Sequence, residues 1–287
     1  MRKAEPPPLS SADTLFDSQR LILGEGLDHL QAHLAGCHDG DAEAIHQARI
    51  ALRRLRSALK LFRRHLDPVA RDGFNDALRA LGRALGVARD WDVFVLETIP
   101  AVHAGSGEVE TLAGPAQGER DAAHLQLRAV LEDPQTQAIL HDLRDWSGSP
   151  AAFAEPADAQ HTIGHDSGRM LDRLARSARR RGRKLDRQDD IGRHALRKSL
   201  KALRYGLEML QSLHEHQAAK PYRKALSHLQ EELGQLNDAI AAVELADRLP
   251  DGPGRDAVRH WSHKRKRAAL EGLPAAWHRF RKMPTFW

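Results

Sequence analysis

Cysteine, aromatic residues and long apolar runs are scarce in this 287-residue chain. The single cysteine, Cys37, rules out an intramolecular disulfide framework and is typical of a reducing compartment such as the cytoplasm. No run approaches the roughly 18 apolar residues that cross a bilayer, and the N-terminal segment lacks the apolar core of a signal peptide. Because aromatic residues are few while Leu, Ala and Arg are abundant, the composition favours helices over sheets. We therefore expect a soluble, cytoplasmic, helical protein.

The sequence also lacks the common catalytic motifs. Residues 105–107 read GSG without the Gly-Lys-Ser/Thr that would complete a Walker A loop, and neither GxSxG nor HExxH occurs. There is no cluster of paired carboxylates of the kind that holds catalytic Mg²⁺. His29, His33 and Cys37, with His38 beside them, have a spacing that suits zinc, but the sequence offers no fourth ligand. We expect a non-catalytic protein without a cofactor or a metal.

Helical periodicity extends over nearly the whole chain between breaks that contain Pro or Gly. A Pro-rich segment at 1–12 is typical of a disordered or extended tail. The segment 148–160, rich in Pro, Ala and Gly, is expected to link two helical bundles, 13–147 and 161–287, of one all-α domain. The pattern predicts helices at 14–36, 41–65, 68–88, 90–102, 107–131, 134–147, 161–184, 190–214, 220–235, 238–249, 254–272 and 273–282.

Two of the expected helices carry the same basic pattern, in which Lys or Arg follows a His after three, seven and ten residues. At about 100° per residue these offsets fall within an arc of roughly 80°, and leucines occupy a separate arc. Each helix therefore has a cationic stripe beside an apolar face that can pack. The first stripe comprises His46, Arg49, Arg53 and Arg56, and the second, 148 residues later, comprises His194, Arg197, Lys201 and Arg204.

The offset of 148 residues continues beyond the stripes. Gly86 and Asp90 correspond to Gly234 and Asp238, so that LGRALGVARDWD and LQEELGQLNDAI are copies of one expected helix–turn element. We infer an internal duplication and expect its two copies to pack about a pseudo-twofold axis, which would bring the stripes into one channel. Asp90 and Asp238 are expected at helix starts, where they cap the helix or orient an arginine.

A basic stripe can be no more than a solvated helix face. Solvated faces alternate in sign so that i, i+4 ion pairs form, whereas the first stripe has no acid and the pattern is duplicated with its histidines. We therefore interpret the stripes as a site for a polyanion, and His46 and His194 as ligand contacts instead of core or capping residues. Lys60 extends the first stripe, whereas Glu208 at the corresponding position shortens the second or closes it by an ion pair.

Further basic residues are weaker candidates for the same site. Four arginines share one face of the helix at 161–184 and form either another wall of the channel or a charged face in solvent. They are Arg169, Arg173, Arg176 and Arg180. The others are Arg20, Arg63, Arg89, Arg128, Lys264 and Arg267.

Four strings together resemble the CHAD family, the conserved histidine α-helical domain. They are HxxRxxxRRLRxxLxxF from His46, LGxxRDWDV from Leu85, HxLRKxLKxLRYxLE from His194 and the C-terminal AWHRFRKMPTFW. The resemblance extends from about residue 13 to Trp287. It implies an all-α fold of two symmetry-related bundles with a central basic channel that binds inorganic polyphosphate. The stripe residues match the family's basic positions, and Tyr205 follows them.

Many members of this family also contain a triphosphate-tunnel phosphohydrolase domain with an ExExK signature. The only ExE here, Glu108 and Glu110, lies in a helical stretch without the following Lys. The resemblance therefore implies the stand-alone type, which binds polyphosphate without hydrolysing it. Because some members locate to polyphosphate granules, the expected partners are polyphosphate and such granules, and not a membrane. The oligomeric state is left open.

Three other functions remain alternatives. A nucleic-acid-binding protein is less favoured, because neither stripe is interleaved with aromatic residues for base stacking and no DNA-binding motif occurs. An enzyme that hydrolyses or transfers phosphate from polyphosphate is the second. The third is a scaffold that docks an acidic protein in the same groove.

Overall fold

The computed structural model describes residues 5–214 and 216–287, and in this part of the chain the regular structure is helical apart from two isolated β-bridges. The all-α fold class is confirmed. The first half contains α1 (Leu15–His38), α2 (Ala42–Leu61), α3 (Pro68–Val93), a π-helical segment (Phe94–Thr98), α4 (Ile99–His103), a 3₁₀ helix (Gly107–Leu112), α5 (Ala113–Glu132) and α6 (Pro134–Ser147). The second half contains α7 (Ile163–Arg181), α8 (Asp190–Met209), α9 (His216–Ala246) and α10 (Pro253–Lys282).

The two stripe helices begin in the same way. Asp41 caps α2 by accepting a hydrogen bond from the backbone N of Glu43 at 2.8 Å, and Asp189, 148 residues later, caps α8 by accepting one from the backbone N of Gly192 at 2.8 Å. Aspartate is among the preferred residues at this position because its carboxylate satisfies an otherwise unpaired amide. The same local chemistry therefore starts both helices at equivalent residues.

The helix boundaries repeat at the offset seen in the sequence. The first residues of α1, α2 and α3 recur 148 residues later as the first residues of α7, α8 and α9. Thr14 forms an isolated antiparallel bridge with Thr162, its own equivalent. Around it, the backbone N of Leu15 donates to the carbonyl of His161 at 2.7 Å, and the backbone N of Ile163 donates to the carbonyl of Asp13 at 2.9 Å. Such a reciprocal pair is what a local twofold axis produces.

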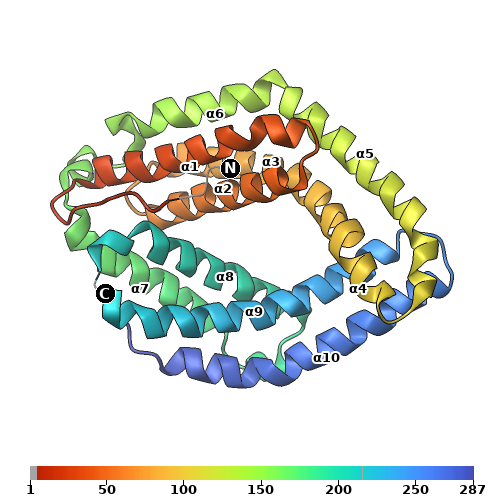
Figure 1. Cartoon of the computed structure of the whole chain (residues 1–287). Helices are drawn as coiled ribbons and strands as arrows, with labels where there is room; N and C mark the ends of the chain where they lie inside the picture. Colours follow the sequence, from red (N-terminus) through yellow and green to blue (C-terminus); the bar gives the residue numbers. More distant parts are fainter. Residues whose placement is uncertain (1–4, 215) are drawn as a thin grey trace.

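The stripe helices lie at the centre of the molecule, with α1–α6 in one half and α7–α10 in the other (Figure 1). α2 packs against α8, and their apolar arcs, including Leu55 and Leu203, are buried in one core that extends across both halves. A second core joins the far ends of the halves, where Trp91 and Phe94 pack with Val258 of α10. Burial of apolar surface therefore fixes the position of the two stripes relative to each other.

Three predicted breaks are wrong, because α3, α9 and α10 are continuous where the sequence suggested turns near residues 89, 237 and 273. Asp90 is consequently inside α3 and not at a helix start. Its carboxylate bonds to Arg49 at 3.1 Å, so a polar side chain that usually favours turns is satisfied by a tertiary contact. Pro274 is tolerated within α10. No described helix is both long and apolar enough to span a membrane.

The described parts of the expected tail and linker contact the helices. Residues 1–4 lie outside the described part of the chain, but Leu9 is buried and its backbone N donates to Ser212 Oγ at 3.0 Å. In the segment 148–160, Phe153 is buried, and the next backbone N, of Ala154, donates to the carbonyl of His65 at 2.8 Å. Both segments pack against the helices because each contributes an apolar side chain to the core.

Candidate anion-binding cavity

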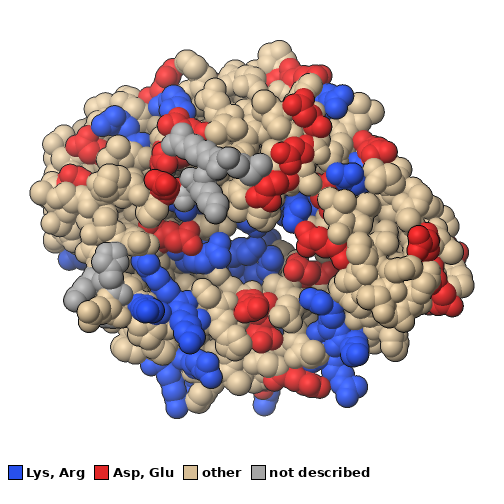
Figure 2. Space-filling model, viewed as in Figure 1, with Lys and Arg blue, Asp and Glu red and all other residues tan. Residues whose placement is uncertain are grey.

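A cavity of about 970 Å³ lies among α2, α3 and α8, beside the C-terminus of α7. Asp72 is the one carboxylate in its lining, against eleven basic side chains. Figure 2 shows Lys and Arg gathered in the hollow between the two halves, with Asp and Glu around its rim. The basic lining residues are Arg49, Arg53, Arg56, Lys60, Arg63, Arg71, Arg79, Arg181, Arg197, Lys198 and Lys201.

Most of the stripe residues meet in this cavity. Residues from both stripes contribute, and the lining contains Arg49, Arg53, Arg56, Lys60, His194, Arg197, Lys201 and Tyr205. His46 and Arg204 lie outside the lining. Among the weaker candidates, Arg63 is in the lining, while Arg20, Arg89, Arg128, Arg169, Arg173, Arg176, Arg180, Lys264 and Arg267 are outside it.

Several cations in the cavity have no counter-ion. Arg53, Lys60, Arg197 and Lys201 form no ion pair with any residue that the structure describes. The Nε atoms of Arg53 and Arg197 are buried without a hydrogen-bond partner there, and so is the hydroxyl of Tyr205. Buried polar groups are normally hydrogen-bonded. The lining therefore offers a set of unsatisfied donors to a ligand with many acceptor oxygens.

Other lining side chains are held in place by their neighbours. Arg49 Nη1 donates to the carbonyl of Gly86 at 2.7 Å and to Asp90 Oδ1 at 3.1 Å. Arg56 Nε donates to Asn75 Oδ1 at 3.2 Å. These bonds orient two guanidinium groups of α2 from α3, which is the role we predicted for Asp90 as an alternative to capping.

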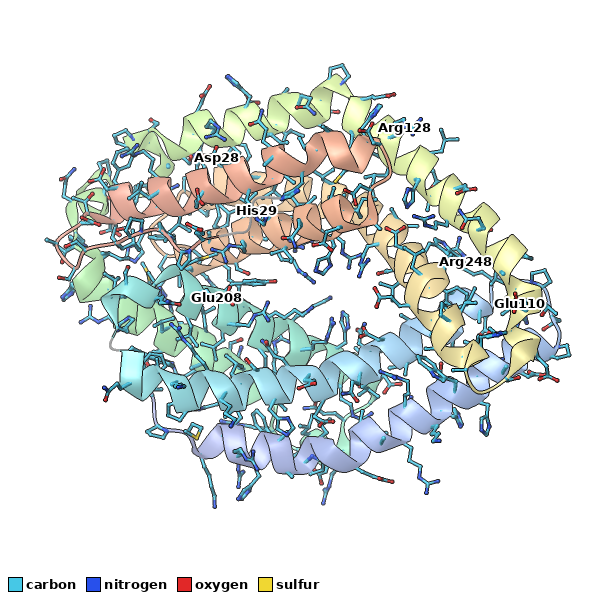
Figure 3. All side chains as sticks on the ribbon, viewed as in Figure 1. Asp28, His29, Glu110, Arg128, Glu208 and Arg248 are labelled. Carbon is cyan, nitrogen blue, oxygen red and sulfur yellow. The ribbon has the colours of Figure 1, made fainter. Side chains whose placement is uncertain are left out.

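Glu208 closes the second stripe by an ion pair, which confirms one of the two predicted alternatives. Its carboxylate contacts Arg204 Nε at 3.3 Å on the same helix and Arg54 Nη1 of α2 at 3.2 Å (Figure 3 labels Glu208 on α8). Arg204 also lies over the ring of Tyr205, 5.0 Å from its centroid. Arg204 therefore has partners within the protein, whereas Lys201 has no ion-pair partner in the part of the chain that the structure describes.

Burial and mutual repulsion change the acidity of these groups. The pKa of Lys201 falls from 10.5 to about 6, chiefly because the amine is desolvated and then because Arg53, Arg197, Arg204 and Arg49 surround it. Burial also lowers the pKa of Lys60, with Arg181 and Arg63 as secondary causes. The cavity thus concentrates positive charge to the point at which one amine is disposed to lose its proton.

The two histidines have different surroundings. His46 is half-buried outside the lining, and its pKa is lowered first by desolvation and then by Arg89. His194 is in the lining and its Nδ1 lies 3.0 Å from Asn237 Oδ1. The duplication of the two residues in the sequence is therefore not matched by equivalent exposure to the cavity.

Sequence reasoning missed one wall of the cavity. Arg71, Asn75 and Arg79 line it from α3, and Arg181 and Lys198 complete it. The residues of α3 are spaced by four, which places them on one helix face, so their alignment was visible in the sequence. What was not visible is that this face turns toward α2.

Most of the remaining basic candidates have local partners. Arg169 lies 3.2 Å from His165, and Arg173 donates to the carbonyl of Leu61. The other arginines form ion pairs with nearby acids, which are Arg176 with Asp172, Arg267 with Glu271, Arg20 with Asp17 and Arg89 with Glu97. Arg128 of α5 donates to the carbonyl of His38 and lies well away from Glu208 in Figure 3. Arg180 and Lys264 are exposed.

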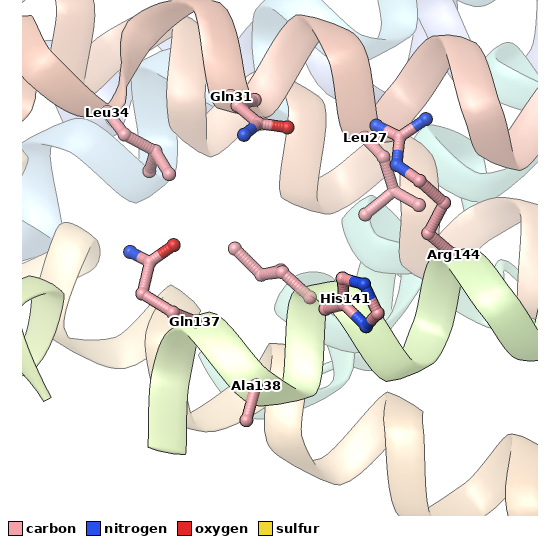
Figure 4. Close-up of a pocket in the computed structure, with 8 residues that line it drawn as sticks. Leu27, Gln31, Leu34, Gln137, Ala138, His141 and Arg144 are labelled. Atoms are coloured by element: carbon pink, nitrogen blue, oxygen red, sulfur yellow. The ribbon is translucent and has the colours of Figure 1, made fainter. Parts of the chain in front are cut away.

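A second cavity of about 410 Å³ between α1 and α6 has a different character (Figure 4). Its lining includes Leu27, Leu34 and Gln137, and the one arginine, Arg144, is paired with Asp28 at 2.5 Å. It does not share the charge of the central cavity. Over residues 5–214 and 216–287, no group of three or more His, Cys, Asp or Glu side chains is placed to hold a metal ion.

Comparisons with known proteins agree with the fold. The structure is similar to the crystal structure of the CHAD domain from the plant Ricinus communis, with a TM-score of 0.80 and 26% sequence identity over 99% of this chain and 97% of that one. It is also similar to PptA from Streptomyces chartreusis, with a TM-score of 0.69 and 16% identity over 94% of this chain and 99% of that one. No curated protein matches the sequence. Because the model of the CHAD domain matches residues 21–247, the chain belongs to the CHAD domain family.

Proposed function

We propose that this protein binds inorganic polyphosphate in the cavity among α2, α3 and α8. The observation that carries the proposal is the lining of eleven basic side chains against one carboxylate, contributed by both copies of the repeat. Arg53 and Lys201, equivalent residues of the two copies, lack counter-ions among the described residues. Membership of the CHAD family fits polyphosphate binding in general.

The chemistry of the lining suits a chain of phosphates. Guanidinium groups bind phosphate oxygens through paired N–H donors, and lysines add mobile point charges. Tyr205 is the one aromatic residue in the lining, and its ring is buried beside Arg204. A ligand that depended on base stacking would find little aromatic surface there. A polymer of phosphate without bases matches this lining better than a nucleic acid does.

Binding without turnover is part of the same proposal. The one carboxylate of the lining, Asp72, lies 2.9 Å from Arg71, and this pairing lowers the pKa of Asp72, so it is a weak general base. We propose that the protein stores polyphosphate or attaches itself to polyphosphate granules through this cavity.

The decisive experiment is calorimetric titration with long-chain polyphosphate at about 150 mM salt, where weak surface interactions are largely screened. The test variant carries Arg53→Glu and Lys201→Glu, which place two carboxylates in the cavity. The matched control carries Lys220→Glu and Lys224→Glu, which change the formal net charge equally at exposed positions of α9. We expect affinity to fall by at least about 100-fold in the test variant, because several phosphate contacts are lost together, and to change little in the control. Equal losses in both would contradict the proposal.

The alternatives are separated by two further measurements. Long polyphosphate should displace single-stranded DNA at a much lower phosphate concentration than the reverse, and the opposite order would favour a nucleic-acid-binding protein. Phosphate release from polyphosphate is measured with Mg²⁺ or Mn²⁺ present. Release that disappears in the Arg53→Glu, Lys201→Glu variant would show turnover in the cavity and overturn the non-catalytic part of the proposal.

A further inference from the structure

We propose that Lys201 is a nucleophilic lysine that acyl phosphates modify selectively in the central cavity. Acyl phosphates carry a phosphate group next to an electrophilic carbonyl carbon. The proposal goes beyond polyphosphate binding, because it assigns a covalent modification and a second class of phosphorylated ligand to the same cavity. It depends on three features of Lys201: its position, its lack of a counter-ion among residues 5–214 and 216–287, and its contrast with the other lysines of the lining.

The position of Lys201 brings anionic reagents to it. The residue projects from the middle of α8 into the cavity, and its charged neighbours are Arg49 and Arg53 from α2 and Arg197 and Arg204 from its own helix. A cavity of one sign of charge raises the local concentration of oppositely charged small molecules. The phosphate of the reagent would be held by the arginines, which leaves its carbonyl carbon within the same cavity as the amine.

The acids near Lys201 already have partners. Asp90 of α3 bonds to Arg49, and Glu208 bonds to Arg204 and Arg54. Burial lowers the pKa of Arg197, and Asp238 of α9 opposes this shift electrostatically, whereas the largest effects on Lys201 come from desolvation and four arginines. Lys201 is half-buried and surrounded by cations, and no carboxylate among the described residues forms an ion pair with its amine.

This environment favours the neutral amine, which is the nucleophile. With a pKa of about 6 for Lys201, most molecules carry the neutral amine at neutral pH. An ordinary lysine has a pKa near ~10.4, so about one molecule in a thousand is neutral at the same pH. Lysines that become nucleophiles in proteins owe their reactivity to such desolvation and cationic neighbours.

The other lysines of the lining provide an internal comparison. Lys60, at the far end of the first stripe, is more exposed than Lys201 although burial also lowers its pKa, and Lys198 is exposed one turn before Lys201. Both can meet a reagent that enters the cavity, but each has more contact with solvent. Selective reaction at Lys201 would therefore reflect its surroundings and not merely access to the cavity.

The reaction is a simple acyl transfer. The lone pair of Lys201 Nζ attacks the carbonyl carbon of the acyl phosphate. The bond between this carbon and the oxygen that bridges it to phosphorus then breaks. Inorganic phosphate leaves with that electron pair, and the nitrogen loses a proton to water. The product is an amide at Lys201, which can no longer become cationic, so acylation would permanently remove one charge from the polyphosphate site.

The test treats the full chain with acetyl phosphate at about pH 7.5 and follows the acetylation of individual lysines by peptide mass spectrometry. The comparison residues in the same sample are Lys60, Lys198 and the exposed Lys264 of α10. We expect Lys201 to react at least about tenfold faster than each, because its neutral fraction is larger. A rate at Lys201 no higher than that at Lys198 or Lys264 would overturn the proposal.

A second reagent separates nucleophilicity from attraction of the anion. An uncharged acetyl ester of N-hydroxysuccinimide should also prefer Lys201, but by a smaller factor, because the arginines do not attract it. If the uncharged ester shows no preference, the amine is not activated and the proposal fails. Preincubation with long polyphosphate should slow acetylation of Lys201 by at least about tenfold. Bound phosphates raise the pKa of the amine, so that it takes up a proton, and they also block access to it. Selective acetylation that polyphosphate leaves unchanged would support the nucleophile and contradict the proposed polyphosphate site.

Discussion

At the scale of single residues, the repeat is not chemically symmetric. Arg53 and Lys201 occupy equivalent positions and both line the cavity without counter-ions among the described residues. Arginine keeps its charge in such a place because the guanidinium group is not deprotonated in proteins, whereas lysine releases its proton when it is desolvated. The arginine of the pair is therefore charged with or without a ligand, whereas Lys201 is a cation at neutral pH only when an anion stabilises it.

The affinity for polyphosphate should increase as the pH falls. Free Lys201 has a pKa of about 6, and a bound polyanion raises it. Between these two pKa values each binding event takes up a proton, so we expect affinity to rise by up to about tenfold per pH unit from about pH 8 to about pH 6. Titration calorimetry in buffers of different ionisation enthalpy measures both the affinity and the proton uptake.

The variant Lys201→Arg identifies the source of this dependence. Arginine stays charged throughout the range, so the slope of affinity against pH should become flatter and the proton uptake smaller. Similar slopes in the two proteins would assign the effect to the histidines or to the phosphates themselves.

The same lysine should make the ligand-free protein less stable at low pH. Unfolding restores the ordinary pKa of about 10.4, whereas the folded value is about 6. Between these values the unfolded chain binds more protons at this residue, so its contribution makes the free energy of unfolding rise with pH. Lys201→Met removes the ionisable group, and thermal unfolding of the two proteins from about pH 6 to about pH 9 should show a smaller increase of Tm in the variant. An unchanged increase would mean that the amine keeps its proton in the folded state.

At the scale of elements, close helix packing places the cavity walls. α1 covers α2 from the side opposite the stripe, and a Cβ added at Gly36 would lie 2.6 Å from the Cβ of Ala44. A Cβ cannot move without its backbone, so a side chain at Gly36 would separate the start of α2 from α1. Correct placement of the stripe helix therefore depends on a glycine in the helix behind it.

Gly36→Ala and Gly234→Ala form a matched pair of tests. The first should destabilise the protein by about 1–3 kcal/mol through overpacking. The second adds a methyl group with no neighbour within 4 Å in the middle of α9, so it should stabilise by about 0.5–1 kcal/mol through helix propensity. Denaturant unfolding at one temperature measures both. Equal effects would show that α1 and α2 can separate without loss of packing.

At the scale of the whole molecule, two halves are joined by apolar cores while their facing surfaces hold like charges. The cores include Leu55 and Leu203 at the centre and Trp91 and Val258 at the far end. These apolar contacts hold the basic groups together against their repulsion. The free energy gained by burying apolar surface is larger than the repulsion energy of a few screened charges. In the ligand-free protein the basic groups therefore repel one another, and a bound anion would reduce this repulsion.

Salt should distinguish the free protein from its complex. Raising the salt from about 50 mM to about 500 mM screens the repulsion in the cavity, so the Tm of the free protein should increase. Polyphosphate at about 100 times its Kd should stabilise the protein by about 2.7 kcal/mol, and this gain should shrink as salt weakens binding. Differential scanning calorimetry over a grid of salt and polyphosphate concentrations measures both. A Tm of the free protein that falls with salt would mean that the cations are effectively paired.

The sequence by itself determined the features that depend on local chemistry. Helical period, the two stripes, the equivalent caps Asp41 and Asp189 and the offset of 148 residues can all be read from residue type and spacing. These features survive in the structure because helix formation and capping involve residues within a few positions of one another. The ion pair of Glu208 was also foreseeable, since Arg204 is one turn away on the same helix.

Only the tertiary structure decided which charges face one another. Packing of α2 on α8 placed Arg53 beside Lys201 and left His46 and Arg204 outside the cavity, although all four belong to the same sequence pattern. The orientation of α3, which adds Arg71 to the lining, likewise depends on packing between helices. The reason is physical: a helix face is set by its own sequence, but its partner is set by the shape and burial of surfaces distant in the chain.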